Sequence, residues 1–104
     1  MMVEIKAIIR LDRLDDVLHA IRQVPGASGV TVSKVEGFGR QHPPRPQSDG
    51  FGQVHMAKVE TVVPRTTAPA VVDAINRAAA TGRPGDGKIF VLPVDEVINV
   101  RIGQ

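Results

Sequence analysis

The stretch TGRPGDGKIFV, residues 81–91, places a glycine-rich loop directly before an apolar strand. Gly82, Gly85 and Gly87 allow the backbone to turn tightly and to approach a ligand without Cβ atoms in the way. Lys88 follows the last glycine, so backbone N–H groups and one ammonium group are available to an anion such as phosphate. The spacing differs from that of a P-loop, which also precedes a helix and not a strand. Two interpretations therefore stand, a phosphate cradle and a helix-to-strand turn with a solvated lysine.

The composition excludes several kinds of site. The chain of 104 residues contains no cysteine, tyrosine or tryptophan, and its formal charge is +2. Disulfides, thiolate metal ligands and cysteine nucleophiles are thereby excluded. The pI of about 9.5 would suit nucleic-acid binding, but the basic residues are scattered and aromatic side chains are few. Nucleic-acid binding is therefore the least favoured function. The N-terminus MMVEIK lacks the apolar core of a signal peptide, and no apolar run approaches the ~20 residues of a membrane span. We expect one cytoplasmic domain over residues 1–104.

Hydrophobic periodicity predicts the elements around this loop. Alternating apolar residues indicate strands, and apolar residues at i, i+3, i+4 and i+7 indicate helices. Asp12 is the expected cap of the first helix, Thr66 or Thr67 caps the second, and Pro69 fits the first turn of the second. The predicted elements are a strand at 3–9, a helix at 14–21, a strand with a bulge at 30–38, a proline-rich exposed loop at 41–54, a strand at 55–63, a helix near 69–78, a strand at 88–92 and a last short strand at 98–102.

This order predicts a ferredoxin-like βαββαβ fold, with an antiparallel sheet that carries both helices on one face. The other face would present Ile8, Val62 and further apolar side chains with no helix to cover them. Burial against copies of the same chain is the simplest way to remove such a face from water.

Four stretches together resemble the PII signal-transduction family over nearly the whole chain. They are Ala7 to Arg10 (AIIR), Val30 to Val32 with Gly37 to Gln41 (GFGRQ), Val62 to Pro64 (VVP), and Thr81 to Pro93 (TGRPGDGKIFVLP). Each stretch alone is weakly specific, whereas their joint occurrence in one small chain is a strong signal.

The resemblance implies a homotrimeric regulator without enzymatic activity. It binds an adenine nucleotide (ATP, ADP or AMP), with Mg²⁺ as an accompanying ion, in clefts between subunits. The loop at 41–54, called the T-loop in that family, would control a partner such as a membrane transporter or an enzyme. Carried over by position, the phosphates would lie on Gly85, Asp86, Gly87 and Lys88, with further charge from Arg40 and Arg101, and the adenine and ribose on Thr31, Gly37 and Val62. The same resemblance assigns Ile8, Phe38, Gly39 and Gln41 to the site.

Departures from the family pattern change the modification and the ligands that we expect for this chain. The tyrosine that carries nucleotide attachment in the family is absent, so this modification is excluded. Met56 stands where the family has the lysine that pairs with 2-oxoglutarate, and Asn99 replaces the first of two C-terminal arginines. A changed metabolite input and a shift from ATP toward ADP or AMP are the expected consequences.

Two features of the sequence allow other interpretations. Asp86 has the sequence context of a turn residue that bonds its own backbone, and no paired catalytic motif supports an enzyme. His42 and His55 bracket the long loop and are weak candidates for metal ligands, since a clear third ligand is missing. A metal- or small-anion-responsive trimer linked to a transport system is therefore the alternative function.

Overall fold

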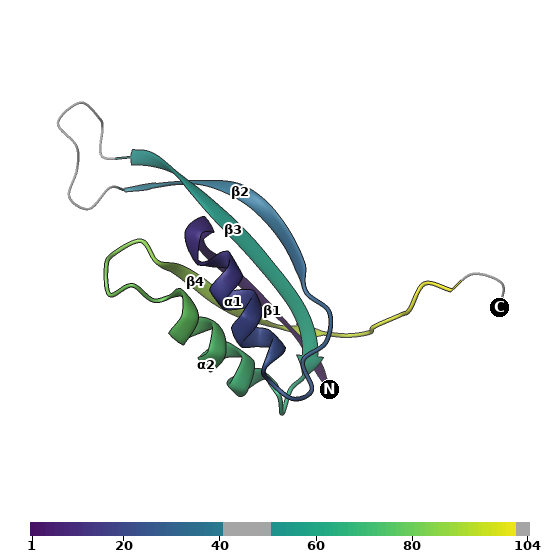
Figure 1. The fold of residues 1–104 in the computed structure, drawn as a ribbon. Coiled ribbons are helices and arrows are strands. Elements are labelled where there is room, and N and C mark those ends of the chain that lie inside the picture. The colour runs from purple at the N-terminus through teal and green to yellow at the C-terminus, as the bar shows by residue number, and fades with distance from the viewer. Residues whose placement is uncertain (41–50, 102–104) are drawn as a thin grey trace.

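The structure, a computed structural model, describes residues 1–40 and 51–101. In chain order its elements are β1 (Met2–Arg10), the short 3-10 helix η1 (Leu11–Arg13), α1 (Leu14–Arg22), β2 (Thr31–Arg40), β3 (Phe51–Pro64), α2 (Ala68–Ala79) and β4 (Gly87–Val94). The strands form one antiparallel sheet in the order β2-β3-β1-β4, and both helices lie on the same side of it (Figure 1). The predicted ferredoxin-like fold is confirmed.

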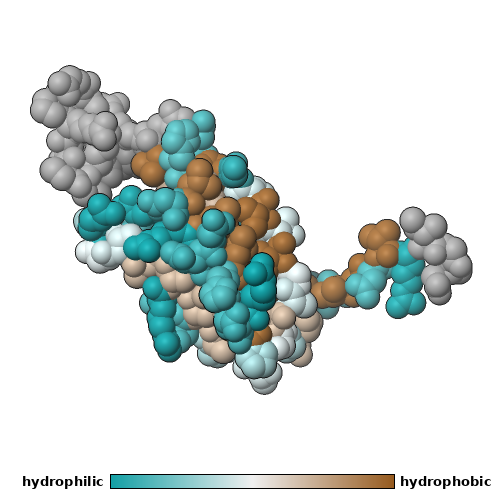
Figure 2. Space-filling view, in the orientation of Figure 1, coloured by the Kyte–Doolittle hydropathy of each residue, from teal (hydrophilic) through white to brown (hydrophobic). Residues whose placement is uncertain are grey.

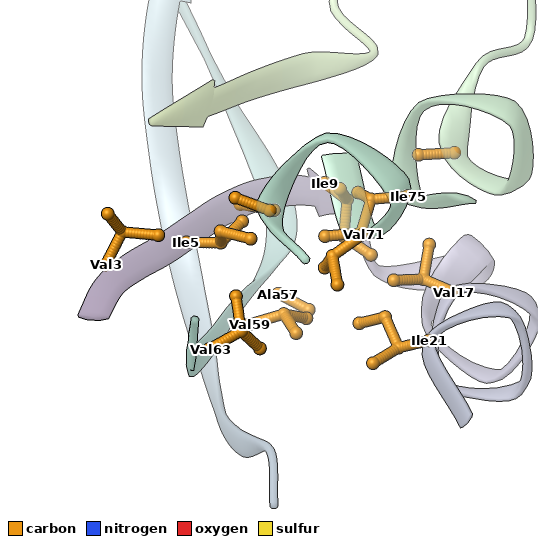
Figure 3. Packing of buried hydrophobic residues seen from close by; sticks show 13 residues of the cluster. Val3, Ile5, Ile9, Val17, Ile21, Ala57, Val59, Val63, Val71 and Ile75 are labelled. Carbon is orange, nitrogen blue, oxygen red and sulfur yellow. The ribbon is translucent and has the colours of Figure 1, made fainter. Parts of the chain in front are cut away.

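The hydrophobic core lies between the sheet and the two helices. Successive side chains of a strand point to opposite faces, so every second residue of β1, from Val3 to Ile9, is buried. These side chains meet Val17 of α1 and Val71 of α2 (Figure 3). Each buried valine or isoleucine side chain stabilises the fold by about 1.5–3 kcal/mol. The helices are thereby fixed over the middle of the sheet, while one end of the β2–β3 hairpin extends past them (Figure 1).

The β2–β3 hairpin corrects two predictions. Pairing between these strands is continuous from Thr31 opposite Glu60 to Arg40 opposite Phe51, so the bulge predicted in residues 30–38 was wrong. The irregular alternation that suggested a bulge has another cause. Val32 and Val35 point to opposite faces of the sheet, since Val32 lies near Leu18 of α1 whereas Val35 is paired with Met56 on the sheet face opposite the helices. Because β3 begins at Phe51, residues 51–54 belong to a strand and not to the predicted loop. The expected turn at 49–50 lies outside the described residues.

The helix starts also differ in part from the prediction. Asp12 lies in η1 and does not cap α1, whose N-cap residue is Arg13. A backbone hydrogen bond replaces the expected side-chain cap, because the Leu14 N–H at the start of α1 donates to the Leu11 carbonyl of η1. Thr67 is the N-cap residue of α2, as expected, but without a side-chain hydrogen bond, and Pro69 fits the first turn as predicted.

The sheet face opposite the helices is more polar than expected. Ile8 and Val62 lie on this face as predicted. Ile8 is paired with Lys58 and Val62 is paired with Glu4, and paired residues of neighbouring strands share a face. Between them, however, lie Glu4, Lys6 and Glu60, with the Lys58 ammonium 3.9 Å from the Glu60 carboxylate. This face therefore carries both apolar and charged side chains. The aliphatic stems of the charged side chains can cover part of its apolar surface.

The predicted last strand is absent from the described residues. Residues 96–101 pair with no other strand, and the segment leaves the sheet at the end of β4 (Figure 1). Val97, Ile98 and Val100 are 55%, 79% and 95% exposed, and the segment shows apolar surface in Figure 2. An apolar segment that pairs with no strand of residues 1–40 and 51–101 presents its side chains for packing elsewhere.

Candidate functional site

The glycine-rich loop of residues 80–87 opens onto a hollow of about 350 Å³, here called the loop hollow. The sheet register builds it: β1 lies between β3 and β4, and Ile8 is paired with Lys58 on one side and with Lys88 on the other. The hollow is lined by Ile8, Gly37, Phe38, Val54, Met56, Gly85, Gly87 and Lys88. Six residues predicted from three separate stretches for one site thus come together, namely Ile8, Gly37, Phe38, Gly85, Gly87 and Lys88.

Three glycines of the loop adopt backbone angles that other residues rarely take. Their φ angles are 79° at Gly82, 88° at Gly85 and 123° at Gly87. Gly87 is also required by contact, because a Cβ atom there would lie 1.8 Å from the Ile8 carbonyl oxygen. The glycines therefore allow the loop to turn and to lie directly on β1.

Asp86 organises the loop through three donors. Its carboxylate accepts hydrogen bonds from the Thr81 N–H at 2.7 Å and from the Thr81 hydroxyl at 2.5 Å. Arg10 Nε donates to the same carboxylate at 3.0 Å. The Thr81 hydroxyl and N–H, followed by Arg10, hold the pKa of Asp86 well below its usual range. Asp86 thus bonds its own loop, as a turn aspartate should, and also anchors that loop to β1.

Sequence reasoning missed the roles of Arg10 and Thr81. The sequence offers Arg10 only as part of the AIIR match, because Arg10 lies 76 positions before Asp86. The usable signal is the pairing of the end of β1 with the start of β4, where Ile9 stands opposite Gly87. In that register, Arg10 follows Ile9 and lies beside the loop that precedes Gly87.

A second hollow of about 670 Å³ lies at the opposite end of the sheet, here called the sheet-end hollow. Its lining includes Thr31 and Val62, two of the three residues expected on the adenine and ribose side, whereas the third, Gly37, lines the loop hollow. The buried Thr61 hydroxyl donates to the Gly29 carbonyl at 2.9 Å and holds the α1–β2 connection against this end. Thr31 and Gly37 are six residues apart on one strand, a span of about 20 Å. Within one chain, therefore, Thr31 and Val62 do not join Gly37 and Lys88.

The remaining predicted site residues have different positions. Gly39 pairs with Gly52, and the backbone of Arg40 pairs with Phe51, near the tip of the hairpin. Arg101 is exposed on the C-terminal segment. Gln41 lies outside the described residues.

The predicted metal ligands are only partly described. His55 is exposed on β3 opposite Glu36, and His42 lies outside the described residues. Within residues 1–40 and 51–101, no three His, Cys, Asp or Glu side chains are grouped as metal ligands. Over the same residues, no helix is long and apolar enough to span a membrane.

Fold and loop together define a small α+β protein with a glycine-rich loop beside a hollow on a ferredoxin-like sheet. The family described as nitrogen regulatory protein P-II matches residues 2–104, and the chain belongs to that family. The chain is 45% identical to the nitrogen regulatory protein P-II of Rhizobium meliloti (strain 1021), covering 99% of this chain and 95% of the relative. It is 43% identical to nitrogen regulatory protein P-II 1 of Escherichia coli (strain K12), with the same coverage.

A solved structure agrees with these relatives. The crystal structure of Arabidopsis thaliana PII bound to citrate has a TM-score of 0.79 to this chain and is 40% identical, covering 99% of this chain and 86% of that one. The resemblance seen in the four sequence stretches is thereby confirmed, and signal transduction in nitrogen regulation fits the family's name.

Proposed function

We propose that this chain is a non-enzymatic regulator that binds ATP, ADP or AMP between the subunits of a homotrimer. The nucleotide phosphates would lie in the loop hollow of one subunit, and the adenine would lie in the sheet-end hollow of the next. The T-loop, which connects β2 to β3, would then bind and control a partner protein, such as a membrane transporter or an enzyme. The single domain of residues 1–104 would work in the cytoplasm.

The separation of the two hollows carries this proposal. Gly85, Gly87 and Lys88 offer backbone N–H groups and an ammonium group suited to phosphate, but the hollow of about 350 Å³ that they line is open to solvent. Thr31 and Val62 lie at the other end of the sheet. A complete site therefore needs two copies of the chain, and closed symmetry repeats such a site around a ring.

The charges at the loop suit a polyphosphate with Mg²⁺. Lys88 is exposed at the start of β4, and Arg101 would add a second cation from another subunit. Arg40 and Gln41 would complete the site from the base of the T-loop. Bound phosphate at this position would bias the order of the adjacent loop and so change its affinity for the partner.

A small anion is the second candidate ligand. The structurally similar Arabidopsis protein was solved with citrate. Carboxylates accept hydrogen bonds from the same donors as phosphates do, and Lys88 at the loop hollow offers its ammonium group to either anion. A polycarboxylate would then be the regulatory ligand in place of a nucleotide.

Calorimetric titration with ATP, ADP, AMP and citrate, each with and without Mg²⁺, tests these proposals. We expect nucleotide binding in the micromolar range and a loss of roughly 10- to 100-fold in Lys88→Ala, the effect of removing one hydrogen bond to a charged group. Lys34→Ala is the matched control, since Lys34 is an exposed lysine on β2 outside the lining of both hollows. Light scattering on the same samples measures the subunit number. Binding of citrate alone would favour the second candidate, and a wild type that binds no nucleotide would disprove the first.

A further inference from the structure

Arg10 joins the end of β1 to the glycine-rich loop at two points. Its Nε donates to the Asp86 carboxylate at 3.0 Å, and its Nη2 donates to the Pro84 carbonyl at 2.9 Å. The side chains of Arg10 and Asp86 are only 25% and 23% exposed. A guanidinium group that bonds two acceptors from one plane fixes direction as well as distance.

The other end of the loop is held through the same carboxylate. Thr81 donates to Asp86 from both its N–H and its hydroxyl, and the Arg83 N–H donates to the Thr81 hydroxyl at 3.3 Å. Thr81 lies just after α2, and Asp86 lies just before β4. The loop is thus closed at its base by Asp86 and tied to the sheet by Arg10.

The charge of Asp86 makes this tie important for an anion site. The carboxylate lies two residues before Lys88, in the loop proposed to hold phosphates. A free carboxylate at that place would repel a phosphate group and would compete with it for the loop's N–H donors. Arg10 supplies a compensating positive charge and directs the carboxylate oxygens toward itself and Thr81.

We propose that Arg10 is a positioning residue for ligand binding: it latches the glycine-rich loop to β1 and neutralises Asp86, so that the loop accepts phosphate. This inference rests on the proposed function of the loop hollow. Arg10 does not line that hollow, and it acts through Asp86 and Pro84. It therefore differs from Lys88, which is proposed to contact the ligand itself.

The test compares Arg10→Met, Arg10→Lys and the double variant Arg10→Met with Asp86→Asn. Arg13→Met is the control, because Arg13 is a nearby arginine whose ion pair is with Asp16 of the adjoining helix. ATP affinity is measured by calorimetry, and amide hydrogen exchange of residues 81–88 is measured in the nucleotide-free protein. Circular dichroism verifies that each variant is folded.

We expect Arg10→Met to weaken ATP binding roughly tenfold or more and to accelerate exchange in residues 81–88. The double variant should regain part of the affinity but not the slow exchange, since only the uncompensated charge has been removed. Arg10→Lys should fall between wild type and Arg10→Met, because one ammonium cannot reach both acceptors with the guanidinium geometry. If Arg10→Met fails to fold, Arg10→Lys alone decides, through the same two measurements.

Either of two results overturns the inference. Unchanged ATP affinity in Arg10→Met would show that the loop needs no such neutralisation, and unchanged exchange would show that Arg10 does not latch it. A wild type that binds no nucleotide would remove both the proposed function and the role of Arg10 in binding, while faster exchange in Arg10→Met would then leave only a structural tie. The two failures are therefore distinguishable.

Discussion

The backbone of Gly87 lies so close to Ile8 that a Cβ atom would stand 1.8 Å from the Ile8 carbonyl oxygen. The φ angle of 123° at Gly87 adds a second reason for glycine at this position. β4 therefore begins where only a residue without a side chain fits against β1. The glycine-rich loop is anchored at this end by contact and at its base by the Arg10–Asp86 ion pair.

Gly87→Ala is expected to displace the start of β4 and to destabilise the protein. Forcing alanine into the backbone angle of Gly87 costs about 1–3 kcal/mol. Moving β4 away from Ile8 to make room for the methyl group destabilises the fold further. Urea unfolding measures the change in the free energy of unfolding, and the exchange of residues 81–88 measures the local effect. Gly29→Ala is the control, because no atom lies within 4 Å of the added Cβ and its φ angle is not in the left-handed region. Equal stability of the two variants would contradict the role given to the Gly87 contact.

The latch around Asp86 is expected to weaken in acid. Because the folded protein lowers the pKa of Asp86, its stabilising effect is complete above the ordinary aspartate pKa of about 4 and is lost as the pH falls through the lowered value. The stability difference between wild type and Asp86→Asn should therefore shrink as the pH is lowered from 6 toward 2, in urea unfolding at about one-unit steps. Asp95→Asn, at an exposed position after β4, is the comparison. A difference that stays constant over this range would show that the charge of Asp86 is unimportant.

The Glu4 carboxyl group on the open sheet face gives the opposite pH dependence. The pKa of Glu4 is raised, chiefly by its hydrogen bond with Glu60, then by burial and the charge of Glu60, while Lys6 and Lys58 oppose the shift. A raised pKa means that the stabilising contribution is present at low pH and is lost as the pH rises through it. We expect Glu4→Gln to raise the thermal midpoint at pH 7 and to change it little near pH 4, in scans at fixed protein concentration.

Lys6→Gln provides the matched contrast to Glu4→Gln. Removing this ammonium group takes away a charge that favours ionised Glu4, so the thermal midpoint at pH 7 should fall. A lower midpoint in Glu4→Gln at neutral pH would refute the assignment of a repulsive carboxyl pair.

The exposed C-terminal segment is expected to stabilise contact between subunits. Ile98 and Val100 are 79% and 95% exposed, so replacing both with serine should leave the fold of the single chain intact by circular dichroism. We expect the double variant to dissociate at a higher protein concentration than wild type in analytical ultracentrifugation. Asn99→Ser, in the same segment, is the control. Unchanged association of the double variant would show that the segment packs outside the subunit interface.

The core and the helices could be predicted because their signals are local. Alternation in β1 and helical spacing around Val17 and Val71 put apolar side chains on one side of each element, and these side chains are buried as predicted. The bulge and the first helix cap were wrong because both depend on neighbours. β2 pairs with β3 without interruption, and η1 supplies backbone groups in place of the Asp12 side chain.

Short-range periodicity and closely spaced motifs were sufficient to predict the family, the order of the strands and helices along the chain, and the glycines and lysine of the loop. Which distant residues meet depends on how the strands pair in three dimensions. The antiparallel pairing of β1 with β4 brings Arg10 to Asp86 across 76 positions, and the length of β2 separates Thr31 from Gly37. Contacts of this kind depend on which strands are neighbours in the sheet and on their register, and local sequence patterns specify neither.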